Sequence, residues 1–275
     1  MMSVSQRLLL CSVLFCILVV PMAAVADSIW LSRPDQGDEL RLEAVLPNVE
    51  DGNFTTFSLA WFLSGTFEAK ETLALSVDVP FAHVANPEGS ESSTAIGNPY
   101  IGLRLGPRDA GVMGEIGVRL PFAPDNEEAA LFGFIIDQVD RPEAFLPEVA
   151  SATLGLNYRH RSVEGFGVRL RLAPILWFDT GSTLADDFEA WISYSAQGTC
   201  RAGPASFGAG FVGRYLASDD SDANFGQKSV HEFDIFTNLD YGRLKPSLRI
   251  RIPLDKDLTK NYDPSAVLSL GVGLP

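Results

Sequence analysis

Hydrophobic and polar residues alternate with a period of two along most of the chain after residue 38. In the segment TLALSVDV (72–79), aliphatic residues share one face, and Ala, Ser and Asp share the other. The same alternation recurs at 101–106, 115–120, 154–159 and 247–252. Successive side chains of a β-strand point to opposite faces of its sheet, so this pattern predicts strands and not helices.

The alternation extends through twelve segments. We predict strands at 38–46, 54–64, 70–80, 97–107, 111–122, 149–160, 165–176, 186–197, 204–217, 228–240, 243–254 and 264–274. Most of these strands are longer than the strands of soluble proteins, and their length suits a strand that crosses a bilayer at a tilt.

The connections between the segments alternate in length. The connections after even-numbered segments are short, whereas those after odd-numbered segments are longer, and the longest are 81–96 and 123–148. Short turns at one end and long loops at the other are typical of membrane barrels. With an even number of strands, both termini would lie at the short-turn end, which faces the periplasm in such barrels.

Alternation alone also fits a secreted, soluble β-sandwich, which would bury the aliphatic face instead of exposing it to lipid. The other face carries Gly, Ala and Ser mixed with Arg and acids, which suits a lumen better than a solvated sheet surface. An open sheet of this size would leave apolar edge strands, and closure removes such edges. We therefore predict an all-β fold, a closed antiparallel up-and-down transmembrane β-barrel of about 12 strands.

Aromatic residues cluster near the segment ends, where membrane barrels place interfacial girdles. The predicted girdle residues are Trp61, Phe81, Tyr100, Phe122, Tyr158, Trp177, Phe178 and Tyr215.

The first 26 residues have the organisation of a secretory signal peptide. Arg7 precedes an apolar run over 8–20, and the small residues at 24–26 predict cleavage between Ala26 and Asp27. The run is shorter than a membrane-spanning helix requires. We predict a signal peptide at 1–26, a barrel at 27–275, and a location in the outer membrane of a Gram-negative-type bacterium.

The charge balance argues against nucleic acid as a partner. The sequence has 35 acidic and 21 basic residues and a formal net charge of −14, whereas phosphate contacts need a basic surface. Loss of residues 1–26 removes one arginine, so the mature charge is 20 − 35 = −15. No phosphate loop, zinc-ligand spacing or haem motif occurs, so we expect no cofactor and no metal. The expected partners are outer-membrane lipid, the barrel-insertion machinery and a small-molecule solute.

Residues 73–123 resemble a known family. A strand ending in VDVPF (77–81) is followed by IGNPYIGLR (96–104) and then EIGVRLPF (115–122). This order is similar to that of the outer-membrane barrel family associated with the meta-pathway of phenol degradation. The resemblance implies uptake of small, often apolar or aromatic compounds. The family usually has Asp where Asn98 stands and Thr-Gly at 122–123, and outer-membrane barrels commonly end in Phe, whereas this chain ends in Leu274-Pro275.

The polar strand faces carry arginines and acids that would line a lumen. The predicted lumen-lining residues are Arg104, Arg119, Arg169, Arg171, Arg249, Arg251, Asp78, Glu115, Glu189 and Asp234, with Arg159 and Arg214 as further candidates. A cationic lining would favour anionic solutes. Alternatively, the arginines pair with the acids and fill a lumen that is narrower than those of larger porins.

The 123–148 connection has its own apolar segment. Asp125-Asn126 would cap a short helix, and Pro142 and Pro147 would end any continuation of it. Folded inward, this segment would form a constriction through Leu131, Phe132, Phe134, Ile135 and Ile136. The alternative is a packed extracellular loop.

We predict that the chain is not an enzyme. His83, His160 and His231 are the only histidines, and His160-Arg161-Ser162 falls at a short turn. No pattern places a histidine between a nucleophile and a third, orienting group. The predicted function is passage of small solutes through a narrow, Arg-lined lumen. The alternative is a plugged structural or surface-binding barrel that acts through its long loops.

Overall fold

The structure, a computed structural model, describes residues 38–47, 58–85, 92–106, 111–125, 128–163, 165–181, 183–184, 187–218, 224–255 and 264–275. The predicted signal peptide and its cleavage site at Ala26 and Asp27 lie outside these residues. Within the described ranges, no helix has the length and apolar character to span a membrane.

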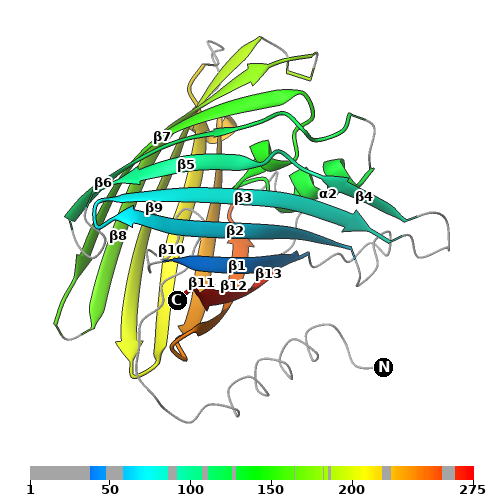
Figure 1. Cartoon of the computed structure of the whole chain (residues 1–275). Helices are drawn as coiled ribbons and strands as arrows, with labels where there is room; N and C mark the ends of the chain where they lie inside the picture. The colour runs from blue at the N-terminus through cyan, green and yellow to red at the C-terminus, as the bar shows by residue number, and fades with distance from the viewer. Residues whose placement is uncertain are drawn as a thin grey trace.

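The strands form one antiparallel sheet that closes on itself (Figure 1). They are β1 (Glu39–Leu46), β2 (Leu59–Lys70), β3 (Leu73–Val84), β4 (Ser93–Ile96), β5 (Tyr100–Leu105), β6 (Gly111–Arg119), β7 (Val149–Arg161), β8 (Phe166–Asp179), β9 (Phe188–Ala202), β10 (Ala205–Leu216), β11 (Ser229–Leu239), β12 (Leu244–Pro253) and β13 (Ser265–Gly273). Pairing of β2 with β3 and of β1 with β13 completes the ring. Both β4 and β5 pair with β3 and together occupy one position, so the barrel has 12 strands. The predicted fold class is confirmed.

The two ends of the barrel differ as the sequence predicts. The connections β2–β3, β5–β6, β7–β8, β9–β10 and β11–β12 are short, and positive φ angles at Gly165 and Gly242 allow two of the tight turns. Glu39 at the start of β1 pairs with Gly273 at the end of β13, so both ends of the sheet lie at the short-turn end. The long connections, including the one between β6 and β7, lie at the opposite end.

The side-chain period of two separates an apolar outer face from a polar inner face. Leu103, Ile116 and Leu156 are about half exposed on the outside, and Leu156 is 56% exposed. Asp78 and Arg251, on the other face, are fully buried. This arrangement is the inverse of a soluble sandwich, and the exposed aliphatic rows suit contact with lipid hydrocarbon.

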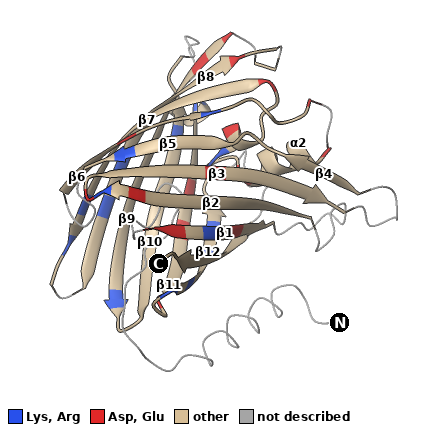
Figure 2. Cartoon of the chain, viewed as in Figure 1, with Lys and Arg blue, Asp and Glu red and all other residues tan. Residues whose placement is uncertain are grey.

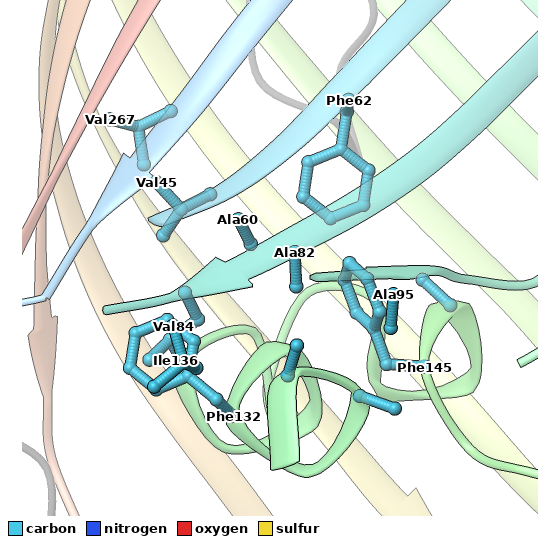
Figure 3. Close-up of a cluster of buried hydrophobic side chains, with 13 residues drawn as sticks. Val45, Ala60, Phe62, Ala82, Val84, Ala95, Phe132, Ile136, Phe145 and Val267 are labelled. Atoms are coloured by element: carbon cyan, nitrogen blue, oxygen red, sulfur yellow. The ribbon is translucent and has the colours of Figure 1, made fainter. Parts of the chain in front are cut away.

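The β6–β7 connection folds inside the barrel. We call residues 120–148 the insert, of which 120–125 and 128–148 are described. It contains helix α2 (Glu128–Ile136) and the short 3-10 helix η1 (Pro142–Ala144). A second 3-10 helix, η2 (Phe225–Gln227), precedes β11. Helix α2 packs on the inner faces of β2, β3 and β4 (Figure 3). The insert therefore occupies part of the lumen and is not a loop packed outside it.

Two of the predicted girdle residues do not lie on the outer face. Phe122, Tyr158 and Phe178 are exposed on the outer face. Tyr100 and Trp177 are buried inside the barrel. Both occupy positions of their strands whose side chains point inward in the alternating pattern. Nearness to a strand end does not reveal which face a side chain occupies.

A charge on the outer face tests the inverted orientation. We expect Leu156→Arg to lower the free energy of unfolding by about 2–4 kcal/mol, the cost of a midplane Arg on the lipid face. Denaturant titration in lipid vesicles measures this change, with Leu156→Ile as the control. A near-zero change for Leu156→Arg would contradict contact of this face with hydrocarbon.

Candidate functional site: the lumen and its insert

Apolar contacts hold α2 against one side of the lumen. Phe132 and Ile136 of α2 and Phe145 after η1 are buried in a cluster with Phe62 of β2 and apolar residues of β1, β3 and β4. The rings of Phe62 and Phe145 meet edge to face, 5.7 Å apart. Gly133 allows this packing, because a Cβ there would lie 2.7 Å from the ring of Phe145.

Some of the predicted constriction residues are buried against the barrel wall, and others are exposed. Phe132 and Ile136 are buried, and Phe134 packs partly buried against the same cluster. Ile135 is half-buried, and Leu131 is 60% exposed. The apolar part of the segment therefore attaches the insert to the barrel wall, and Leu131 faces away from that contact. Whether the segment narrows a conducting path stays a prediction.

Asn98, between β4 and β5, fastens both ends of the insert. Its side-chain oxygen accepts hydrogen bonds from the backbone N–H groups of Phe122 (2.7 Å) and Ala123 (2.8 Å). Its amide nitrogen donates to the carbonyl oxygens of Leu146 (2.7 Å) and Glu143 (2.9 Å). The Asn98 side chain is fully buried. An aspartate at this position could accept the first two bonds but could not donate the others.

On the other side of the lumen, Asp137 pairs with two arginines. Its carboxylate accepts hydrogen bonds from Arg141 Nε (2.8 Å) and from Arg251 Nη1 of β12. Arg251 also donates to the carbonyl oxygen of Ile136 at 2.6 Å. Burial alone would raise the pKa of Asp137, but the guanidinium groups of Arg141 and Arg251 outweigh it and lower the pKa to about 2.

Two further acids of the insert extend this network. Asp140 Oδ2 accepts a hydrogen bond from Arg249 Nη2 of β12 at 2.7 Å. Glu143 forms two bonds with Arg214 of β10, at 2.8 and 3.2 Å. Paired donors from one guanidinium are a strong and geometrically specific way to hold a carboxylate. The insert is thereby joined to the β10–β12 side of the barrel.

Arg141 of the insert contacts the wall of the barrel on the same side as α2. Its guanidinium pairs with Glu43 of β1, and its Cζ lies 3.4 Å from the centroid of the Phe62 ring. Burial would lower the pKa of Arg141, but the charges of Asp137, Glu43 and Asp140 raise it above its ordinary value. The insert thus makes ion pairs to β1, β10 and β12 as well as apolar contacts to β2–β4, and it crosses the lumen between them.

The remaining predicted lumen residues also lie on inward-facing positions. Arg119 bonds to Asp78 (3.0 Å) and to the carbonyl oxygen of Asn98 (2.8 Å), which links it to the insert. Arg249 lies 3.5 Å from Asp234. The other contacts are Arg104 with Glu68 (3.3 Å), Arg169 with Asn157 (3.0 Å), Arg171 with Glu115 (3.1 Å), and Glu189 with the indole of Trp191 (3.0 Å).

Figure 2 shows basic and acidic residues alternating along β1, where Arg41 pairs with Glu39. The structure therefore shows the predicted arginines next to acids or polar groups.

Several residues of this network were not among the predicted site residues, namely Glu43, Asn98, Asp137, Asp140, Arg141 and Glu143. The acids of the insert stand in an irregular segment, where no periodicity indicates a facing partner. The one available signal was the Asp-x-x-Asp-Arg sequence at 137–141 directly after an apolar helix.

The structure also reveals a histidine cluster on the outer face. His231 Nδ1 is 3.0 Å from Asp255 Oδ1, and His231 Nε2 is 2.7 Å from the Tyr194 hydroxyl. The rings of Phe211 and Phe225 lie 5.4 and 5.9 Å from the imidazole. Sequence analysis placed no orienting group beside a histidine, and here Asp255, which is distant in sequence, takes that position. Both ring nitrogens are engaged by protein groups, so the cluster fastens η2 and the chain after β12 to the barrel wall.

Asn98 both accepts and donates hydrogen bonds, so replacing it with Asp should remove only the donated ones. We expect Asn98→Asp to destabilise the protein by about 2–4 kcal/mol, because it leaves buried carbonyl oxygens without donors. Hydrogen exchange of the amides in 128–146 should speed up. The matched control is Asn157→Asp, because the Asn157 side-chain oxygen only accepts, from Arg169. Equal effects of the two variants would contradict the role of Asn98.

The lowered pKa of Asp137 sets the acid resistance of the insert. Its folded pKa, about 2, lies below the ordinary 3.8, so its ion pairs stabilise fully above about pH 4 and are lost as the pH falls towards 2. Protease protection of the insert should therefore persist at pH 5 and decline only below about pH 4. Asp137→Asn should abolish this step and cost about 3–5 kcal/mol at neutral pH. Release of the insert at pH 5–6 would contradict the assignment.

Comparisons with known proteins support the barrel and leave its family open. No family model and no curated sequence matches the chain. Among solved structures, the NanC porin has a TM-score of 0.50 at 8% identity, covering 87% of this chain and 100% of that one. The TodX deltaS2S3 mutant monoaromatic hydrocarbon channel scores 0.47 at 10% identity (87% and 91%). The Salmonella typhi outer membrane phospholipase dimer scores 0.44 at 11% identity (91% and 99%). At such identities the likeness shows the fold alone, that of an outer-membrane β-barrel.

Proposed function

We propose that this barrel passes small solutes across the outer membrane through the part of its lumen beside the insert. The observation that carries the proposal is the uneven distribution of the insert's contacts around the ring. Most of its buried apolar residues pack on β1–β4, Val139 packs with Val212 and Phe236, and its charged residues pair with β1, β10 and β12. The inner face of β9 carries small polar residues such as Ser193 and Ser195, which fill less of the lumen than large side chains would.

The charges towards the short-turn end favour anions. Inward basic side chains of the described strands outnumber the acidic ones there: Arg41, Arg104, Arg159, Arg169, Arg171 and Lys245 against Glu39, Glu68 and Glu115. A surplus of positive charge lowers the barrier for anions and raises it for cations. The proposed lumen is therefore Arg-lined in its selective half, whereas the arginines near the insert serve mainly to hold it.

Membership of the phenol-pathway family and passage of apolar or aromatic solutes remain part of this proposal. Support for apolar solutes comes from an inward cluster near the long-loop end. Trp177 and Trp191 contact each other at 5.2 Å and pack with Val149 and Ile175. A flat apolar solute could lie on such a surface.

The second candidate function is a plugged barrel that acts through its long loops. It is favoured by the buried ion pairs on two sides of the insert, because breaking any one of them is costly. Flux separates the two functions, since a plugged barrel passes no solute.

Planar-bilayer recordings test the proposed function. We expect the wild-type barrel to give small, anion-selective conductance. Replacing 127–139 with a short Gly-Ser linker should raise the conductance several-fold, because the segment fills part of the lumen. Phe132→Ala, which loosens the buried side of α2, should act in the same direction, and Leu131→Ala, on its exposed side, is the matched control.

Two results would contradict the proposal. A silent wild-type barrel that opens only after replacement of 127–139 would establish the plugged barrel. Cation selectivity of the wild-type protein would contradict the assignment of the arginine-rich half as the selective region.

A further inference from the structure

The inner faces of β7, β8 and β9 carry several polar side chains. We call Ser151 of β7, Arg171 of β8, and Ser193, Ser195 and Gln197 of β9 the polar lane. Arg171 pairs with Ser195 in the β8–β9 register, next to the Ala173–Ser193 pair. Ser151 pairs with Trp177, four residues along β8 from Ala173 towards the long-loop end. The six residue steps from Trp191 to Gln197 give the lane a length of roughly 20 Å along β9.

The lane carries polar atoms that the protein does not satisfy. In the part of the chain that the structure describes, the hydroxyls of Ser151, Ser193 and Ser195, Gln197 Nε2 and Arg171 Nη1 have no hydrogen-bond partner. Each of these residues is more than nine-tenths buried. Leaving such a group unpaired costs about 1–3 kcal/mol, and buried polar groups in proteins nearly always have a partner. Several on one wall indicate a ligand that supplies the partners.

The kind of atom identifies the chemistry of that ligand. Gln197 Nε2 and Arg171 Nη1 can only donate hydrogen bonds, and a serine hydroxyl can donate as well as accept. Trp177 Nε1, just above the lane, is another buried donor with no partner among the described residues. The lane therefore requires a solute rich in acceptor oxygens. A hydrocarbon would leave every one of these donors unpaired.

The two ends of the lane add charge and shape. Arg171 and Arg169 supply positive charge towards the short-turn end, where a carboxylate would be stabilised. Trp191, half-buried beside Trp177 at the other end, offers a flat apolar surface on which a sugar ring can stack. A hydroxylated ring that bears a carboxylate matches both ends and the donors between them.

We propose that the polar lane binds hydroxylated carboxylates of the sugar-acid class and guides them through the lumen. This inference rests on the proposed passage of small solutes and assigns the lane to acceptor-rich anions, in place of the apolar or aromatic solutes considered above. It assigns selectivity to β7–β9, the side of the lumen opposite the attachment of α2.

Flux into proteoliposomes tests the proposal with three probes. Glucuronate has both hydroxyls and a carboxylate, glucose lacks the charge, and benzoate lacks the hydroxyls. We expect glucuronate to enter fastest. The double variant Ser193→Ala/Ser195→Ala should raise the half-saturating glucuronate concentration about threefold to tenfold, the effect of losing one or two hydrogen bonds. Benzoate entry should not change.

The matched control is Ser247→Ala. Ser247 is also an inward, buried serine, but its hydroxyl already bonds to that of Ser269. We expect no change in glucuronate entry for this variant. Arg171→Met should weaken glucuronate entry and leave glucose entry unchanged, which separates recognition of charge from recognition of hydroxyls.

A binding measurement distinguishes failure of the lane from failure of the channel. Glucuronate should quench tryptophan fluorescence of the detergent-solubilised protein, and Trp191→Phe should remove most of that response. Quenching without flux supports the lane and overturns the proposed passage. Flux in which benzoate and glucuronate enter equally, with the serine variants inert, overturns the lane and leaves passage intact. Neither quenching nor preference for glucuronate overturns the lane.

Discussion

Closure of the sheet is the constraint on which the other features depend. In hydrocarbon, every backbone N–H and C=O must find a partner within the protein, and a ring of strands meets this requirement without a free edge. Once the ring is closed, the period of two sends alternate side chains inside. Twelve strands enclose an interior too narrow for many unpaired charges. The ion pairs between strands, and between strands and insert, follow from that geometry.

The insert contacts different parts of the ring with different kinds of side chain. On one side it adds apolar contacts, so β2–β4 have a small hydrophobic core within a polar lumen. Towards β10 and β12 it adds carboxylates, which balance the charges of Arg214, Arg249 and Arg251. The β7–β9 side keeps its own polar groups. The side chains around the lumen thus differ in chemistry from one part of the ring to another.

Much of the fold was predictable from sequence, because it depends on a periodic signal. Most strand positions, the alternation of short and long connections and the location of both ends of the sheet follow from the spacing of aliphatic residues. The structure differs at β2, which ends at Lys70 and not at 64, and at β4, which was not predicted as a separate strand. Tyr100 and Trp177 lie inside the barrel, although their nearness to strand ends suggested a girdle, because their positions in the alternating pattern point inward. The contacts of the insert were not predictable, since an irregular segment has no period. Asn98 stood out only as a difference from a family pattern, and the sequence gives no reason to connect it with residues about 25 and 48 positions away.

The attachment by Asn98 has a consequence for how such a barrel can vary. A single side-chain amide holds the chain where it leaves β6 and where it returns towards β7. These bonds fix both ends of the connection independently of the residues between them. The β6–β7 pairing itself is made by strand residues alone, from Gly111–Arg159 to Arg119–Ser151. Barrels of this architecture can thus acquire different interiors while the wall that folds in the membrane stays the same.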